Sequence, residues 1–285
     1  MAEETTIELK RAALNHYFQN LNTPQQQAVF HVNGPVLVLA GAGSGKTTAM
    51  IHRIVQMIHF GDGWVQANAS ITKEDAAYLK DYIADKQPAD LERLCSILAV
   101  QPIQPWHILA ITFTNKAANE LRSRLLQAIG EECASMLHAS TFHSACVRIL
   151  RRSISKLGYD SNFTIYDTDD SQRLMKSCIA DADVSEKQFP PRAVLTEISL
   201  AKDRMCSPEY FCIEAGSDYR KMVIGKLYKE YQNRLKSANA LDFDDLIYKT
   251  VELLESFPEE LEYYQNRFRY IMVDEYQDTN HAQFR

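Results

Sequence analysis

The sequence of 285 residues has little of several features that mark large protein classes. No apolar run approaches the roughly 20 residues that a membrane-spanning helix needs. The N-terminus begins with acidic residues and lacks the apolar core of a signal peptide. Its six cysteines form no C-x-x-C pair, which argues against a disulfide framework or a zinc site. These absences predict a protein of the reducing cytoplasm without a membrane partner.

Glycine and proline are also scarce, at ten and nine residues, and 46% hydrophobic with 24% charged residues is typical of a globular chain. A chain of this length can bury a sizeable core in one large or two modest domains. The net charge of −6 argues against a protein that coats nucleic acid non-specifically, although it leaves room for a local basic groove.

One stretch reverses this charge balance. Residues 141–157 contain no acidic residue and carry four basic ones, Arg148, Arg151, Arg152 and Lys156. The pattern is compatible with a surface that faces an anion. A solvated helix face explains the same composition equally well.

The most informative stretch is residues 35–50, where an apolar run is followed by a glycine-rich turn and a helix-compatible segment. This order of strand, loop and helix is typical of a phosphate-binding loop, whose glycines let backbone N–H groups face phosphate oxygens. We predict that Lys46 reaches the β- and γ-phosphates and that the hydroxyl of Thr47 binds Mg²⁺. Ala40 replaces the glycine of the strict pattern, and alanine is small enough for that position. A glycine-rich hairpin is the alternative, and the flanking segments disfavour it.

A helix is expected just before this loop, with Thr23 as its N-cap and Pro24 at its first position. The amide of Gln25 has a donor and an acceptor that can read an adenine edge. On the residue alone, a surface position without such a role is the more frequent outcome. An amphipathic helix is expected earlier, over residues 5–19.

Residues 61–105 carry no chemical motif and show two short helical patterns, the first opened by a capping-box-like sequence at Thr72. We interpret them as a helical insertion packed on the core, with binding of a partner as the alternative. Residues 108–113 form a buried-strand pattern, followed by a helix capped by Thr114 or Asn115. A further strand is expected at residues 135–140, and a helix after it.

Residues 158–239 read as mostly helical, with a short extended piece at 163–166 and a long helix at 218–236. Their separate apolar periodicity predicts a second, helical subdomain. The segment 241–247 opens another helix with three carboxylates in its first turn, which the helix dipole alone explains.

An apolar strand at residues 270–273 runs into Asp274 and Glu275. A carboxylate at the carboxyl end of a parallel strand beside a phosphate loop is well placed to hold Mg²⁺, which we assign to Asp274. The neighbouring Glu275 can orient and deprotonate a water for attack on the γ-phosphate.

Taken together, these motifs resemble the UvrD/PcrA/Rep family of superfamily 1 DNA helicases, and most closely its PcrA branch. The resemblance rests on residues 21–29, 40–48, 108–121, 140–152, 241–247 and 270–280 in the family's order. Two motifs are the most specific: TFTNKAA at residues 112–118 and DEYQDTN at 274–280. The fold implied is an α/β RecA-like P-loop NTPase domain with a parallel sheet, interrupted by a mostly helical subdomain.

The resemblance also implies roles for single residues. ATP would contact Gln25, Ala42, Gly43, Ser44, Gly45, Lys46, Thr47 and Thr48, and Mg²⁺ would bind Thr47 and Asp274. Catalysis would depend on Lys46, on Glu275 as the residue that activates water, and on Gln277 as a sensor of the γ-phosphate. DNA would contact Phe113, Thr114, Asn115, Thr141, Phe142 and His143. Stacking of bases on aromatic rings would make such binding tolerant of sequence.

The activity implied is 3′-to-5′ movement on single-stranded DNA and unwinding at duplex junctions, driven by ATP, in repair or replication. Two departures stand out: the insertion at 61–105 is long for the family, and the sequence stops at Arg285, before the family's later motifs. The strand expected next would lie between the strands that precede Lys46 and Asp274. We therefore interpret the chain as an N-terminal part whose missing C-terminal half supplies the arginines that complete the ATP site.

The expected domains are residues 1–152, a RecA-like first part, residues 153–237, the helical subdomain, and residues 238–285, the RecA-like second part. Two other classes stay open for this chain. One is a module that binds nucleotide and DNA without useful turnover. The other is a helicase-like subunit of a recombination nuclease, although the sequence shows no nuclease motif.

Overall fold

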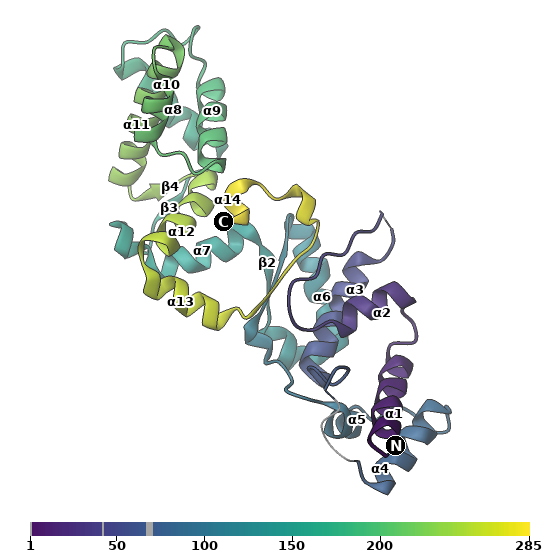
Figure 1. Cartoon of the computed structure of the whole chain (residues 1–285). Coiled ribbons are helices and arrows are strands. Elements are labelled where there is room, and N and C mark those ends of the chain that lie inside the picture. Colours follow the sequence, from purple (N-terminus) through teal and green to yellow (C-terminus); the bar gives the residue numbers. More distant parts are fainter. Residues whose placement is uncertain (1, 42, 67–70) are drawn as a thin grey trace. The chain divides into compact units, whose positions relative to one another are not determined.

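A computed structural model describes residues 2–41, 43–66 and 71–285 (Figure 1). The chain divides into two compact units: residues 1–140 with 267–274, and residues 141–266 with 275–285. Helices and parallel strands together make up the fold, so the predicted α/β class is confirmed. Within the described residues, no helix is long and apolar enough to cross a bilayer.

The first unit contains six helices and two helical turns among its described residues. These are α1 (Ala2–Tyr17), α2 (Thr23–Phe30), α3 (Lys46–Val55), α4 (Lys73–Ile83), α5 (Leu91–Leu98) and α6 (Asn115–Met136), with the π-helical turn η1 (Gln56–Phe60) and the 3₁₀ turn η2 (Pro105–His107). The helices predicted at the N-terminus, after Lys46 and in the insertion are therefore confirmed.

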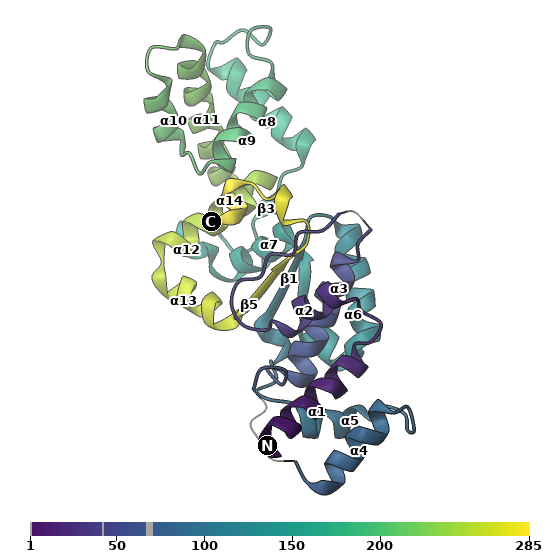
Figure 2. The ribbon, with the colours of Figure 1, turned by 45° about the vertical axis from the view of Figure 1, so that its right-hand side comes forward.

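A three-stranded sheet has the order β2 (His138–Thr141), β1 (Ile108–Thr112), β5 (Tyr270–Val273). Strands β1 and β5 run parallel and side by side, in a register that pairs Ile108 with Tyr270 and Ile111 with Val273 (Figure 2). Every residue of β1 is buried. The ladder continues one residue further, where the amide of Asp274 donates to the carbonyl of Ile111 at 2.9 Å. Asp274 therefore stands at the carboxyl end of a parallel strand, as predicted.

The strand predicted at residues 35–40 is wrong. Residues 35–41 have no regular secondary structure, and the side chains of Leu37 and Leu39 are 68% and 84% exposed. A strand needs a partner for its backbone hydrogen bonds, and within the described residues β5 pairs with β1 alone. The resemblance places one further strand between these two segments. Among the described residues, no strand pairs with the apolar run, so it has no ladder to join.

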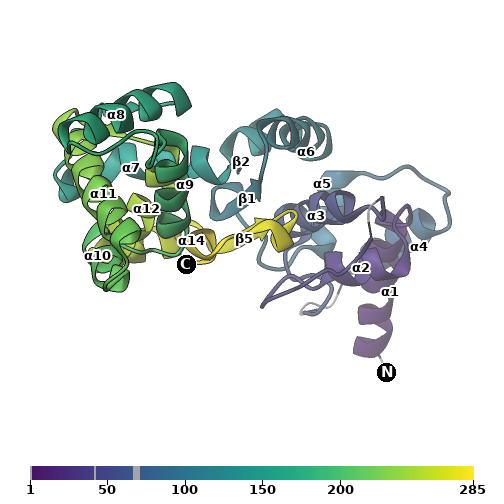
Figure 3. The same cartoon turned by 90° about the horizontal axis from the view of Figure 1, so that it is seen from above.

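The insertion packs on the core of the first unit, as predicted. Helix α4 lies against α1 (Figure 3), and Leu79, Leu94 and Leu98 are fully buried in the same apolar cluster as Leu14 of α1. Its two ends meet at a backbone bridge between Gly61 and Val100. Gly61 has a φ of +53°, and a Cβ there would lie 2.2 Å from the carbonyl oxygen of Val100. Only glycine fits this junction.

The second unit is mostly helical. It contains α7 (Phe142–Ser153), α8 (Thr168–Asp181), α9 (Pro191–Asp203), α10 (Pro208–Ala215), α11 (Tyr219–Ser237), α12 (Phe243–Ser256), α13 (Pro258–Arg267) and α14 (His281–Phe284), the 3₁₀ turns η3 (Ile154–Leu157) and η4 (Tyr276–Asp278), and the short parallel strands β3 (Thr164–Ile165) and β4 (Ala240–Leu241). The predicted long helix is α11. Its buried residues Tyr228 and Tyr231 form a separate apolar core with Met175 and Ile198.

Candidate functional site

The glycine-rich loop leads directly into helix α3. Gly43 and Gly45 have φ angles of +75° and +84°, a region that suits glycine, and Gly45 is the N-cap of the helix. This helix starts without a side-chain cap, so its first N–H groups are available to an anion. Ser44 closes the loop by donating its hydroxyl to the carbonyl of Gly41 at 2.7 Å. Ala42 lies outside the described residues.

Lys46, at the first position of α3, folds back over this loop. Its ammonium donates to the carbonyls of Ala40 and Gly41, at 3.1 and 3.2 Å. The charge is therefore held inside the turn where phosphate oxygens would lie, by two neutral acceptors that a phosphate can replace with a stronger, charge-assisted bond. Thr48 follows in the first turn of the helix and is partly buried.

Gln25 lies against the same loop. Its amide nitrogen donates to the carbonyl of Ser44 at 3.1 Å, and its amide oxygen accepts from the backbone N–H of Asn22 at 3.0 Å. The N-cap of α2 is Asn22, which forms a capping box with Gln25. The prediction of Thr23 as N-cap is therefore wrong by one residue. The side-chain oxygen of Asn22, not that of Thr23, accepts the hydrogen bond from the backbone N–H of Gln25.

Arg53 fixes α2 relative to α3. Its guanidinium donates to the carbonyls of Ala28 and Val32, at 2.7 and 3.0 Å, at the C-terminal end of α2. Burial lowers the pKa of Arg53, and the two carbonyls satisfy donors that would otherwise be unpaired. The close fit is visible at Gly45, where a Cβ would lie 2.6 Å from the amide nitrogen of Gln25. Gln25 is thus held at the loop by its own helix.

The loop and the last strand of the sheet come together at Thr47 and Asp274. The hydroxyl of Thr47 donates to a carboxylate oxygen of Asp274 at 3.1 Å. Both side chains are partly buried, at the N-terminus of α3 and just after β5. Two oxygen ligands of the type that Mg²⁺ prefers are therefore adjacent, with the uncapped helix end beside them.

Glu275 and Gln277 follow Asp274 in the chain and belong to the second unit. Glu275 adopts a left-handed conformation, with a φ of 54° and a ψ of 46°, which is uncommon for a residue with a Cβ. Its carboxylate accepts a hydrogen bond of 2.5 Å from the amide of Gln277. Both side chains are exposed. The two residues that the sequence selects as water-activating and γ-phosphate-sensing therefore contact each other.

The six residues predicted to contact DNA have different surroundings. Phe113 is partly buried after β1, and Thr114 caps α6 by accepting from the N–H of Ala117 at 3.1 Å; Asn115 is exposed. In the second unit, Thr141 caps α7 through the N–H of Ser144, and Phe142 is buried. Thr114 and Thr141 are therefore both helix N-caps, whereas the sequence predicted this role only for Thr114.

His143 follows them on α7 and packs its ring on the ring of Phe243, with the centroids 5.6 Å apart. Burial lowers the pKa of His143, and the nearby carboxylate of Asp244 opposes that shift. Phe243 itself is 54% exposed. An accessible aromatic pair of this kind offers a stacking surface.

Arg151, Arg152 and Lys156 of the basic stretch make contacts inside the second unit. Lys156 contacts Glu259 and Glu260, at 2.5 and 2.9 Å, and Arg152 lies over the ring of Tyr263 at 3.4 Å. Arg151 lies over the ring of Phe163 at 3.8 Å. Carboxylates from α13 therefore neutralise part of the stretch, an arrangement that neither interpretation of the sequence included.

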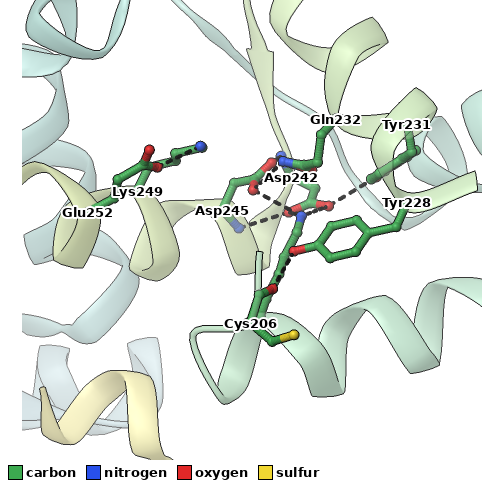
Figure 4. A network of polar contacts seen from close by, with 9 residues as sticks. Cys206, Tyr228, Tyr231, Gln232, Asp242, Asp245, Lys249 and Glu252 are labelled. Atoms are coloured by element: carbon green, nitrogen blue, oxygen red, sulfur yellow. Dashed lines mark hydrogen bonds and ion pairs between the residues drawn. The ribbon is translucent and has the colours of Figure 1, made fainter. Parts of the chain in front are cut away.

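The sequence analysis also missed a buried ionic cluster in the second unit (Figure 4). Lys202 of α9, only 1% exposed, contacts Asp242 at 2.7 Å and Asp245 at 2.9 Å at the start of α12. Tyr231 and Gln232 of α11 donate to Asp242 and Asp245, at 3.0 and 2.9 Å. Two of the three carboxylates in this first turn, Asp242 and Asp245, are thus more than helix-dipole partners, and their presence in the sequence was the available signal.

This cluster contains one cation, Lys202, and two carboxylates, Asp242 and Asp245. Burial lowers the pKa of Lys202, but the two carboxylates outweigh it and the net pKa is raised. Lys202 holds the pKa of Asp242 below its usual range despite burial. Burial and the charge of Asp242 raise the pKa of Asp245. One lysine therefore keeps one of two carboxylates firmly ionised.

Comparison with known proteins agrees with these features. The family described as the UvrD/REP helicase N-terminal domain matches residues 21–68 and 91–285. The unmatched residues 69–90 lie inside the insertion. The chain is 41% identical to the ATP-dependent DNA helicase PcrA of Staphylococcus epidermidis over 271 residues and to that of Bacillus subtilis over 270, and 40% identical to that of Staphylococcus aureus over 273.

These alignments cover 95–96% of this chain but 31% of each relative. The chain thus spans about a third of the length of the curated relatives it matches, as expected of an N-terminal part. Because this family model matches most of the chain, the chain belongs to the UvrD/REP helicase family.

Proposed function

We propose that the whole protein is an ATP-driven motor that moves 3′ to 5′ on single-stranded DNA and unwinds duplex junctions in repair or replication, and that this chain is its ATP-binding N-terminal part. The observation that carries the proposal is the 3.1 Å contact between Thr47 and Asp274. It joins the phosphate-binding loop to the acidic end of a parallel strand, the pair of elements that holds a metal–nucleotide complex. The relatives are ATP-dependent DNA helicases by name, which supports an ATP-driven helicase activity.

Each part of the loop has a role in this proposal. The backbone N–H groups from Gly43 to Thr48 bind phosphate oxygens at the uncapped end of α3, and Lys46 leaves its two carbonyl partners to reach the β- and γ-phosphates. Gln25, held beside the loop, reads the adenine edge. Mg²⁺, held by Thr47 and Asp274, would neutralise charge on the phosphates.

Hydrolysis then depends on the segment after β5. The carboxylate of Glu275 accepts a proton from the attacking water, which makes the water a better nucleophile. Gln277, which donates to that carboxylate, orients the water and responds to the γ-phosphate. Arginines that stabilise the transition state would come from another part of the whole protein, and such groups supply roughly 10³–10⁵ in rate.

DNA is the second partner in this proposal. Phe113 follows β1 and is partly exposed, a position in which its ring stacks on a base. The other residues proposed to contact DNA are Thr114 and Asn115 at the start of α6, and Thr141, Phe142 and His143 at the start of α7. Helix starts are suited to phosphate contacts because their N–H groups are positively polarised.

The test combines ATP hydrolysis with strand displacement on a duplex that carries a 3′ single-stranded tail. Residues 1–285 are expected to bind ATP and single-stranded DNA without displacing a strand, since a motor needs a second domain that opens and closes with each ATP cycle. Hydrolysis stimulated by single-stranded DNA would identify this part as an enzyme rather than a binding module. Efficient displacement by residues 1–285 alone would contradict the proposed division of labour.

A further inference from the structure

Five residues after Glu275, Asn280 is tied to the end of helix α9. Its side-chain amide donates to a carboxylate oxygen of Asp203 at 2.6 Å. Both side chains are partly buried. Burial, and then the nearby carboxylate of Asp244, raise the pKa of Asp203. The amide of Asn280 therefore donates to a carboxylate that is partly removed from water, so this hydrogen bond is stronger than one on an open surface.

Asn280 is held on its other side as well. It is the N-cap of α14, where its side-chain oxygen accepts from the N–H of Gln283 at 2.8 Å and its own N–H donates to the side chain of Gln283 at 3.0 Å. Helix α14 packs against α9 and α12, with Ala282 only 3% exposed. Both the amide nitrogen and the amide oxygen of the Asn280 side chain are thus engaged, and the residue connects α14 to α9.

The anchor point on α9 is itself rigid. Lys202 immediately precedes Asp203 and forms the buried contacts with Asp242 and Asp245. Asp242 is the N-cap of α12 and forms a capping box with Asp245. The last turn of α9 is therefore fixed to the first turn of α12 by a buried lysine, and Asp203 inherits that fixed position.

The bond between Asn280 and Asp203 holds the end of segment 275–280, which begins with the proposed water-activating residue Glu275. Glu275 is in the left-handed region, at a φ of 54°, and the turn η4 leads from it to Asn280. A residue with a Cβ stays in that region only where its surroundings hold it there. Strand β5 precedes Glu275, and the anchor at Asn280 restrains the chain that follows it. If the bond between Asn280 and Asp203 is lost, we expect the backbone of Glu275 to leave the left-handed region. Its carboxylate would then lose the position that the hydrogen bond from Gln277 fixes.

We propose that Asp203, acting through Asn280, is a positioning residue for Glu275. It contacts no reacting group. It holds the far end of the segment 276–280, so that the helical second unit sets the conformation of the carboxylate that activates water. The role of Glu275 in this inference rests on the proposed function, whereas the bond between Asn280 and Asp203 is independent of that function.

The first test is hydrogen exchange of the intact chain. In Asp203→Ala, the amides of Asp278, Thr279 and Phe284 should exchange about tenfold faster, the effect of losing one hydrogen bond to a charged group. Protection in α11 should not change, which shows that the unit stays folded. Asp203→Asn keeps an acceptor and should restore most of the protection. The control Asp169→Ala removes an exposed carboxylate of α8 and should leave both regions unchanged.

The second test separates positioning from folding through ATP hydrolysis in a single turnover. Asp203→Ala and Asn280→Ala should each lower the rate several-fold while the Kd for Mg·ATP stays the same, and the double variant should be no slower than Asn280→Ala. Equal exchange at residues 278–284 in Asp203→Ala and the wild type would overturn the proposal, as would additive losses in the double variant. If the chain fails to bind Mg·ATP, the proposed function fails, and the exchange experiment still decides whether the anchor exists.

Discussion

The hydroxyl of Thr47 and the carboxylate of Asp274 lie 3.1 Å apart, although 227 residues separate them in the sequence. The contact forms because β5 pairs with β1 in a register that brings the end of the strand to the loop that starts α3. It is the structural basis for the metal–nucleotide site that we propose.

Removal of one metal ligand should separate metal binding from nucleotide binding. In Asp274→Ala, the gain in ATP affinity on adding Mg²⁺ should largely disappear, whereas the affinity for ATP without metal should change little. Titration calorimetry with and without EDTA measures both quantities. Asp169→Ala, which removes an exposed carboxylate, is the control. A variant at 274 that kept the full effect of Mg²⁺ would place the metal elsewhere.

A stacking role for Phe113 predicts a loss of affinity that salt does not alter. Phe113→Ala should weaken binding of single-stranded DNA by roughly 1–3 kcal/mol with an unchanged salt dependence, because stacking releases no counterions. Fluorescence anisotropy over a salt series gives both values. Phe284→Ala, which removes a ring that is 67% exposed, should have a smaller effect. Equal losses in the two variants would mean that Phe113 is not a base-stacking residue.

The buried lysine should be essential to the stability of the second unit. Lys202→Met leaves Asp242 and Asp245 without their cation, and breaking a buried pair in this way costs about 3–5 kcal/mol. Urea unfolding measured for this variant and for the exposed Lys187→Met provides the comparison. An unchanged midpoint in Lys202→Met would show that the carboxylates find other partners.

The same cluster predicts a pH dependence of stability. Burial and the neighbouring Asp242 raise the pKa of Asp245 from 3.8 to about 7, against the opposing charges of Lys202 and Lys249. A raised folded pKa means that the native state binds the proton more tightly, so this contribution is complete below the ordinary pKa and is lost as the pH rises through 7. Relative to the wild type, Asp245→Asn should therefore gain stability between pH 4 and 8, by roughly 1.4 kcal/mol for each pKa unit. Unfolding curves at both ends of the range test this, and a constant difference would contradict it.

Much of the fold was readable from local patterns. The buried run at Ile108–Thr112 and the capping sequences at Thr72 and Thr114 gave correct elements, because burial periodicity and end caps act over a few residues. The run at 35–40 had equally good strand composition but formed none. Strand formation depends on a partner strand that is often remote in sequence, and the composition of a segment does not reveal whether that partner is present.

The candidate site divides in the same way. Lys46, Thr47 and Asp274 were found from motifs because phosphate and metal binding require fixed residue types at short spacing. The contacts of Lys202 with Asp242 and of Asp203 with Asn280 were not predicted. Each depends on how α9 packs against α12 or α14, which no spacing in the sequence reveals. The pairing of Lys156 with Glu259 and Glu260 was hidden for the same reason.

The most direct test of the account is calorimetric titration of Mg·ATP into the wild-type chain and Lys46→Ala. Lys46 reaches across the glycine-rich loop to the carbonyls of Ala40 and Gly41, and no other ammonium is present in that loop's sequence. Losing its charge-assisted bonds should weaken binding by roughly 1.5–3 kcal/mol, with the fold unchanged by circular dichroism. Equal affinity in the two proteins would contradict the assignment of this loop as the phosphate-binding site.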